Sequence, residues 1–147
     1  MTAMDVGLYV EASMLLAEFA WRVDNGEGHT VAELFLDDAA IDTPHFRLDG
    51  RAAIHDWFSA RAPKDGPRLS RHHATNLRIR TLDSERIEIL ANALTFVGVA
   101  PAPGQGASVA VGVSRDVVRR TPDGLRFEAR ALQVVMEARL AAPEPHG

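Results

Sequence analysis

The sequence predicts an α+β fold: a cone-shaped, curved and mostly antiparallel (mixed) sheet wrapped around three N-terminal helices, with an internal pocket. Three observations lead to this prediction. The chain has 147 residues, the usual size of one domain. Segments with helical periodicity lie within residues 5–61, and long β-type runs fill residues 69–139. Because only the helices can cover one face of such strands, a hollow remains at the open end, where small ligands bind.

The first helix is predicted over residues 5–24, where apolar residues recur at helical spacing. They are Leu8, Ala12, Leu15, Phe19 and Val23. The run Asn25, Gly26 and Gly28 ends this helix.

Two further helices are expected before the long strands. Thr30 and Glu33 have the spacing of a capping box and predict a short helix over residues 30–36. The turn Asp49–Gly50 leads into a helix over residues 51–61. The apolar face of this last helix consists of Ile54, Trp57 and Phe58.

The strands are identified by β-type composition and by the turns between them. A short strand over residues 39–43 is broken at Pro44 and has residues 46–48 as its hairpin partner. Four long strands are predicted over residues 69–81, 86–100, 107–121 and 125–139. Segments rich in Pro and Gly predict loops at 63–67 and 101–106, and residues 141–147 predict a disordered tail. One domain therefore spans 1–147, with an ordered core of about 5–140.

The composition excludes several classes of function. The net charge is −4 and no basic stripe occurs, which argues against nucleic acid as a partner. The chain has no cysteine, so disulfides and thiolate chemistry are excluded. No metal-spaced cluster of His and carboxylates and no phosphate-binding loop is found, and we expect neither a metal nor an organic cofactor. No signal peptide or apolar run long enough to span a membrane is recognised, and we expect a cytoplasmic protein.

Asp24, at the end of the first helix, is the first candidate for chemistry. Steps of three and four residues back from it pass through a mostly small or apolar face, made of Ala20, Leu16, Ser13 and Tyr9. This pattern indicates that Asp24 can point inward. The alternative is a carboxylate that faces water, which is the commoner environment of an Asp.

His72 and His73 open the first long strand, and only one of them can face the pocket. Leu77 and Ile79 mark the core face, so strict alternation places His73 with them. A bulge near Thr75 would reverse the assignment and bring His72 inward. The pattern alone does not decide between the two histidines.

Arg130 shares its face of the last strand with Leu132, Val134 and Met136. An arginine on an apolar face needs an anionic or carbonyl partner, because an unpaired buried charge is costly. It is either one half of a structural ion pair or a clamp on substrate or developing negative charge. Asn76 can hydrogen-bond a ligand oxygen or a neighbouring backbone group.

Three segments together resemble the SnoaL-like branch of the nuclear transport factor 2 superfamily. They are Val23–Asp24, the run Asp49 to Ile54, and the run His72 to Ile79. The resemblance covers roughly residues 5–139 and is closest to the group of scytalone dehydratase and hexachlorocyclohexane dehydrochlorinase. It implies a cystatin-like roll in which Asp24 and His72 form a catalytic dyad, His72 rather than His73 faces the pocket, and Arg130 is the arginine of the last strand.

The resemblance implies a small-molecule lyase, a dehydratase or dehydrohalogenase, whose His72 removes an acidic C–H proton. Isomerases and polyketide cyclases can use the same dyad. A non-catalytic ligand-binding module, such as one like the small subunit of an oxygenase, is the alternative outside enzymes. Two positions depart from scytalone dehydratase: Val23 stands where that enzyme has a tyrosine, and Ser114 lies in the region of its second histidine.

The expected ligand is a small apolar, aromatic or polycyclic molecule. We expect it to contact six residues, namely Leu16, Phe19, Trp57, Phe58, Asn76 and Met136. A homodimer or homotrimer is also predicted, because strands 86–100 and 107–121 are apolar on both alternating faces. One face covers the pocket, and the other then needs a partner.

Overall fold

The computed structural model describes residues 5–61, 68–99, 106–142 and 144. Its helices are α1 (Val6–Asp24), the 3₁₀ helix η1 (Gly28–Leu34) and α2 (Arg51–Arg61). Its strands are β1 (Phe35–Asp42), β2 (Arg47–Asp49), β3 (Arg68–Thr81), β4 (Arg86–Val99), β5 (Ala107–Thr121) and β6 (Gly124–Leu140). The predicted α+β class and the order of its elements are confirmed. The predicted loop 63–67 lies outside the described residues, as do most of the predicted loop 101–106 and most of the tail 141–147.

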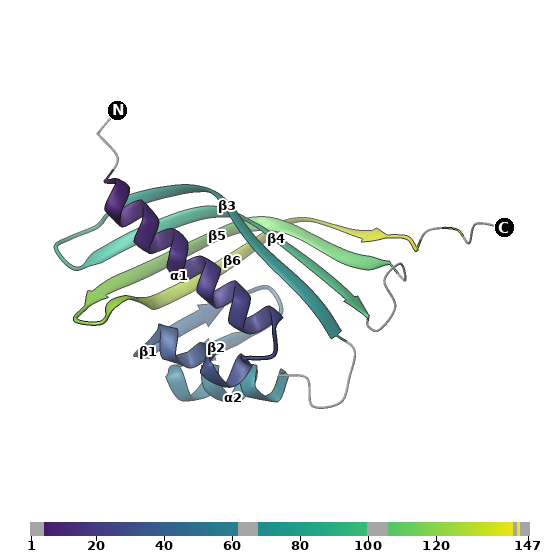
Figure 1. Cartoon of the computed structure of the whole chain (residues 1–147), viewed down its shortest axis with the longest axis horizontal. Helices are drawn as coiled ribbons and strands as arrows, with labels where there is room; N and C mark the ends of the chain where they lie inside the picture. Colours follow the sequence, from purple (N-terminus) through teal and green to yellow (C-terminus); the bar gives the residue numbers. More distant parts are fainter. Residues whose placement is uncertain (1–4, 62–67, 100–105, 143, 145–147) are drawn as a thin grey trace.

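The six strands form one curved, unclosed sheet in the order β2-β1-β6-β5-β4-β3. The pairing of β1 with β6 is parallel and every other pairing is antiparallel, so the sheet is mixed. Figure 1 shows α1 lying across the concave side of the long strands, with α2 beside β1 and β2. The helices therefore cover one end of the concave face and leave the far ends of β3–β6 projecting beyond them.

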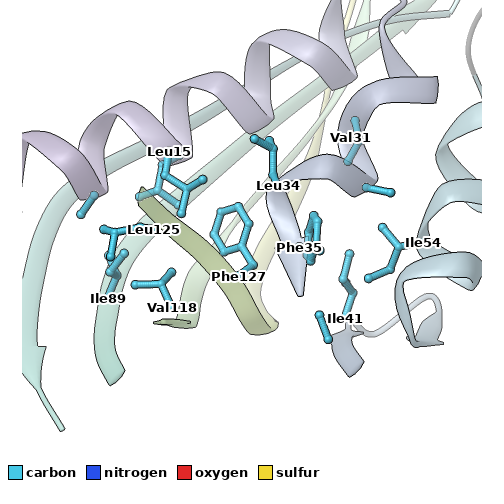
Figure 2. Close-up of a cluster of buried hydrophobic side chains, with 14 of the residues drawn as sticks. Leu15, Val31, Leu34, Phe35, Ile41, Ile54, Ile89, Val118, Leu125 and Phe127 are labelled. Atoms are coloured by element: carbon cyan, nitrogen blue, oxygen red, sulfur yellow. The ribbon is translucent and has the colours of Figure 1, made fainter. Parts of the chain in front are cut away.

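The hydrophobic core lies where α1, η1 and α2 meet the sheet (Figure 2). Phe35 and Phe127 are almost fully buried, and their ring centroids lie 4.9 Å apart across the β1–β6 pair. Phe19 of α1 packs edge-on against Phe127 at 5.9 Å. These aromatic contacts fix the C-terminal half of α1 over β6.

The second helix differs from the prediction. It is a 3₁₀ helix that ends at Leu34, and Phe35 already belongs to β1. The capping box is not formed: the Thr30 hydroxyl donates to the Glu27 carbonyl, and the Glu33 carboxylate accepts from Arg22 instead. Both partners of the expected box are thus engaged elsewhere.

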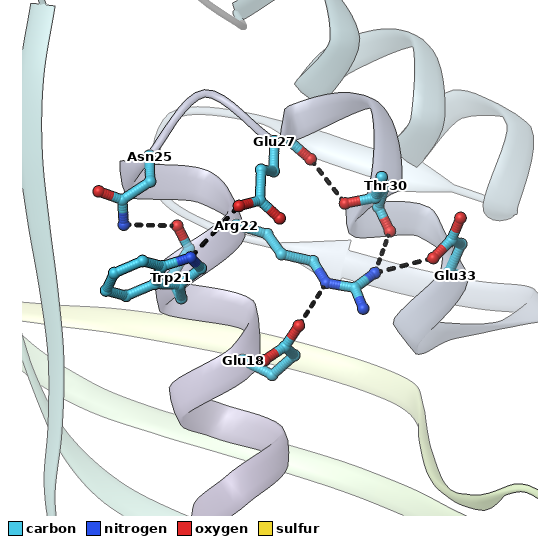
Figure 3. Close-up of polar contacts among 7 residues, drawn as sticks. All are labelled: Glu18, Trp21, Arg22, Asn25, Glu27, Thr30 and Glu33. Carbon is cyan, nitrogen blue, oxygen red and sulfur yellow. Dashed lines mark hydrogen bonds and ion pairs between the residues drawn. The ribbon is translucent and has the colours of Figure 1, made fainter.

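Arg22 ties the end of α1 to η1 (Figure 3). Its guanidinium donates to the Glu18 carboxylate at 2.8 Å, to the Thr30 carbonyl at 2.7 Å and to Glu33 at 2.9 Å. Within the same segment, the Asn25 amide donates to the Trp21 carbonyl at 2.9 Å. This network holds the last turn of α1, which carries Asp24.

Bulges interrupt the alternation of two long strands. In β3 the register with β4 shifts by one residue between Thr75 and Arg78, and Asn76 there has φ 56°. In β6 the register with β5 shifts between Val134 and Met136, and again between Phe127 and Ala129. Each bulge moves the following side chains to the opposite face of the sheet.

Gly112 of β5 lies opposite one of the β6 bulges, and the main chains approach closely there. A Cβ atom on Gly112 would collide with the carbonyl oxygen of Gln133. Gly112→Ala should therefore lower the free energy of unfolding by about 1–3 kcal/mol, because the backbone of two central strands has to move. Urea denaturation measures the loss. Gly98→Ala is the control, since its Cβ would meet its nearest atom at an ordinary 3.6 Å; an equal loss in both variants would contradict the account.

Candidate functional site

A cavity of about 940 Å³ lies between the helices and the concave face of the sheet. Four of the residues expected to contact a ligand line it, namely Leu16, Phe19, Trp57 and Phe58. All four come from α1 and α2, whose apolar faces extend from the core into the cavity. The inner faces of β3, β4, β5 and β6 supply the opposite wall.

Asp24 and His72 meet at one wall of this cavity. The Nδ1 atom of His72 lies 2.6 Å from Oδ1 of Asp24, and the His72 backbone N–H donates to Oδ2 at 2.8 Å. The Ser70 hydroxyl donates to Oδ1 at 2.8 Å. The Asp24 side chain is only 5% exposed, whereas the His72 ring is 31% exposed and lines the cavity.

This geometry fixes the tautomer of His72. Asp24 is an ionised carboxylate and only accepts hydrogen bonds, so Nδ1 carries the proton. The lone pair is then on Nε2, the ring nitrogen that does not contact Asp24. The imidazole is thereby oriented as a base, with a carboxylate positioned to stabilise the imidazolium form.

Burial raises the pKa of the Asp24 carboxyl, but the hydrogen bonds from the His72 ring, the His72 backbone and Ser70 outweigh it. The net effect lowers this pKa below the usual value for an aspartate. Asp24 therefore stays ionised next to His72 throughout the neutral range.

This lowered pKa predicts a specific dependence of stability on pH. The carboxylate of Asp24 contributes stability above the ordinary Asp pKa of about 4, and this contribution is lost as the pH falls further. Asp24→Asn should remove it, so the difference in stability between wild type and variant should shrink as the pH falls from 6 to 3. Urea unfolding at several pH values measures the difference. A difference in stability that stays constant between pH 6 and pH 3 would contradict the lowered pKa of Asp24.

The bulge in β3 explains why His72 and not His73 contacts Asp24, although both histidines border the cavity. The extra residue between Thr75 and Arg78 reverses the alternation, so that His72 lies on the same face as Leu77 and Ile79. The His73 ring instead packs edge-on against Phe96, with centroids 5.9 Å apart. Of the two alternatives left open by the sequence, the structure has the bulged one.

Arg130 lines the same cavity and is held by a residue that sequence reasoning missed, Asp116. The Arg130 guanidinium donates from Nε to Oδ1 of Asp116 at 2.8 Å and from Nη2 to Oδ2 at 3.3 Å. It also lies 4.1 Å from the centroid of the Phe19 ring and 4.5 Å from that of Phe127. The Asp116 side chain is fully buried. This ion pair and the two rings together hold the guanidinium in one orientation.

The structure does not place Asn76 and Met136 with the other site residues. Asn76 forms the bulge of β3 and borders only a smaller hollow beside α1. Met136 follows a bulge of β6 and is 60% exposed, while Val134 and Glu137 line the cavity on either side of it. Strict alternation put Met136 on the cavity face, and the bulge turns it outward.

Across the described residues, no three His, Asp or Glu side chains are grouped as metal ligands would be. Within the same ranges, neither long helix combines the length and hydropathy needed to cross a bilayer.

The sequence model of the SnoaL-like domain family matches residues 7–131 of the chain. The chain belongs to the SnoaL-like family. No curated protein sequence matches it significantly.

Solved structures share the fold of this SnoaL-like chain at low sequence identity. A candidate scytalone dehydratase from Novosphingobium aromaticivorans is 18% identical, with a TM-score of 0.79 over 100% of this chain and 99% of its own. A hexachlorocyclohexane dehydrochlorinase is 16% identical, with a TM-score of 0.77 over 96% of this chain and 97% of its own. An NTF2-like protein from N. aromaticivorans with a cystatin-like fold is 20% identical, with a TM-score of 0.65 over 86% and 81%. The family model thus confirms the expected SnoaL-like family, and these structures confirm the expected fold.

Proposed function

We propose that this SnoaL-like protein is a cofactor-independent lyase of small molecules, of the dehydratase or dehydrohalogenase type. The observation that carries the proposal is the 2.6 Å contact between Asp24 and His72 at the wall of a 940 Å³ cavity. A carboxylate that fixes an imidazole so that one ring nitrogen is a free base is the arrangement that general-base catalysis requires.

The reaction begins with removal of a proton from carbon by Nε2 of His72. The electron pair of the broken C–H bond forms a C=C bond, and the leaving group departs with its own electron pair as hydroxide or halide. The imidazolium, stabilised by Asp24, then returns its proton to hydroxide to give water, or to solvent. Arg130 stabilises the negative charge that develops during the elimination.

Isomerisation and polyketide cyclisation share the first step of this mechanism. In an isomerase the proton returns to another carbon, and in a cyclase the carbanion attacks a second carbonyl carbon. The dyad can serve all three reactions. The likeness in fold to a hexachlorocyclohexane dehydrochlorinase favours elimination, by analogy of fold alone.

The experiment that tests the proposal follows C–H proton exchange in D2O by NMR, with a panel of neutral cyclic ketones and β-hydroxy ketones as substrates. We expect the protein to accelerate exchange or elimination for at least one compound of the panel. Binding of these compounds in the cavity without any exchange would contradict a catalytic role and favour a ligand-binding module.

We also propose that the protein is a homodimer or homotrimer that associates through the outer face of the sheet. Val113 of β5 and Val135 of β6 are 39% and 62% exposed, and Phe96 of β4 is half-buried. Association would remove these apolar side chains from water. Light scattering at micromolar concentration should give the mass of two or three chains, and the mass of one chain would contradict the proposal.

A further inference from the structure

Three residues of the cavity lining carry a buried side-chain polar atom that makes no hydrogen bond within the described part of the chain. Among the described residues, the buried side-chain polar atoms without a hydrogen-bond partner are Trp57 Nε1, Ser114 Oγ and Arg130 Nη1. All three residues line the main cavity. The indole and guanidinium nitrogens can only donate, and the hydroxyl can donate as well. Since buried polar groups in folded proteins are normally paired, donors gathered in one cavity indicate a ligand that supplies acceptors.

Ser114 and Arg130 lie close together on the inner face of the sheet. Ser114 pairs with Leu132 across β5 and β6, and the next inward pair along the strands is Asp116 with Arg130. Asp116 and the ring of Phe19 hold the guanidinium, so its remaining nitrogen Nη1 has a fixed position. The Ser114 residue is 5% exposed, and its hydroxyl is therefore also confined to this region.

The charges around these donors favour a neutral ligand. Asp116 is ion-paired with Arg130 through two hydrogen bonds, which neutralises the guanidinium while leaving its third nitrogen to donate. The carboxylate of Asp24 adds negative charge to the same cavity. Arg61, Glu137 and Arg139 also border the cavity, but each is exposed. An anionic group beside Asp24 and Asp116 would be repelled, whereas a carbonyl oxygen would not.

We propose that the ligand of this cavity is a neutral carbonyl compound whose oxygen accepts hydrogen bonds from Ser114 Oγ and Arg130 Nη1. Trp57 Nε1, on α2, donates to a second oxygen of the same ligand. Ser114 is then a substrate-binding residue. This inference rests on the proposed function and narrows it, because a halogenated hydrocarbon offers these donors no comparable acceptor.

Carbonyl binding at this position is consistent with the chemistry of the dyad. Proton removal from the carbon next to the carbonyl by His72 breaks the C–H bond and moves its electron pair into a C=C bond, so that the carbonyl oxygen becomes an enolate. Ser114 and Arg130 donate to this oxygen and stabilise its charge. Loss of a β-hydroxyl group, protonated by the imidazolium, then gives water and an unsaturated carbonyl product.

Three probes of nearly equal size test the proposal: 2-tetralone, a neutral ketone; tetralin, which lacks an acceptor; and 2-naphthoate, an anion. Calorimetric titration should show that the ketone binds at least about tenfold more tightly than either of the others, a difference of about 1.4 kcal/mol. Equal affinity for 2-tetralone and tetralin, including the absence of binding by both, would overturn the proposal. Tighter binding of 2-naphthoate would overturn the preference for a neutral ligand.

Variants of two serines on the same strand identify the donor. Ser114→Ala should weaken 2-tetralone binding about fivefold or more and leave tetralin binding unchanged, and Ser114→Thr should restore most of the affinity. Ser108 also borders the cavity, but it is exposed and its hydroxyl is not among the buried atoms without a partner, so Ser108→Ala should change neither affinity. Unchanged ketone binding in Ser114→Ala would overturn the role of Ser114.

Proton exchange separates this inference from the proposed function. Preferential binding of 2-tetralone that depends on Ser114, but without exchange of its α-protons in D2O, would disprove the lyase and leave the carbonyl site intact. Exchange of the α-protons, together with binding that does not depend on Ser114, would support the lyase and disprove the carbonyl site.

Discussion

His72→Gln is expected to lower the rate of substrate proton exchange by about 10³-fold, which is a typical contribution of a general base. The melting temperature should be almost unchanged, because Asp24 keeps the hydrogen bonds from Ser70 and from the backbone N–H of residue 72. NMR exchange rates and thermal unfolding of the same samples measure the two effects together.

His73→Gln is the matched control for this prediction. His73 adjoins His72 in β3 and also borders the cavity, but its ring packs against Phe96 and, within the described residues, it makes no hydrogen bond with Asp24. Its substitution should leave the exchange rate within about twofold of wild type, far from the loss expected of a general base. Retained activity in His72→Gln together with a large loss of stability would show that the dyad is structural.

Asp116→Ala is expected to produce the largest loss of stability, about 3–5 kcal/mol in the free energy of unfolding. The substitution leaves the guanidinium of Arg130, only 14% exposed, without its carboxylate partner. For a domain of this length the loss corresponds to a fall in melting temperature of about 10 °C. Urea denaturation and thermal unfolding both measure it.

The double variant Asp116→Val with Arg130→Met tests whether the loss comes from an unpaired charge. Removing both charges at similar volume should recover much of the stability lost by Asp116→Ala, since a buried ion pair is often replaceable by apolar side chains. The double variant should still be inactive, because the donors at Arg130 are gone. A double variant as unstable as Asp116→Ala would show that the cost arises from packing instead.

Periodicity was sufficient to predict the elements of the fold. The apolar spacing of residues 5–24 gave α1 within one residue, and the turns at Asp83 and Pro122 gave the ends of β3 to β6 within two residues. One exception was β1, which begins at Phe35 and not at the predicted residue 39. The other was η1, where the capping-box spacing of Thr30 and Glu33 indicated an α-helix. Hydrogen bonds from distant groups, above all from Arg22, decide the conformation there.

The bulges explain why the site was predicted less well than the fold. Simple alternation cannot show where a strand gains a residue. For this reason the sequence placed Met136 on the wrong face of β6 and did not decide whether His72 or His73 faces Asp24. The same effect concealed the partner of Arg130. Counting back from the Pro122 turn without the bulge near Glu128 pairs Asp116 with Ala129, not with Arg130.

Ser70 was missed for a different reason. Period two from His72 would have placed it on the same face of β3, but a serine at the start of a strand carries no signal of its own. Its contact with Asp24 spans 46 positions in the sequence and depends on how α1 crosses the sheet. Alternation in β5 would have offered a better signal for Asp116, which shares its face with the buried Val118.

The tautomer of His72 is the most direct test of the central claim, that Asp24 holds this imidazole as a base facing the cavity. Long-range ¹H–¹⁵N correlation spectra of the histidine rings, recorded near neutral pH, report which nitrogen carries the proton. We predict that His72 is protonated on Nδ1 with the lone pair on Nε2, and that this preference weakens in Asp24→Asn. A His72 protonated on Nε2 in the wild-type protein would contradict the account.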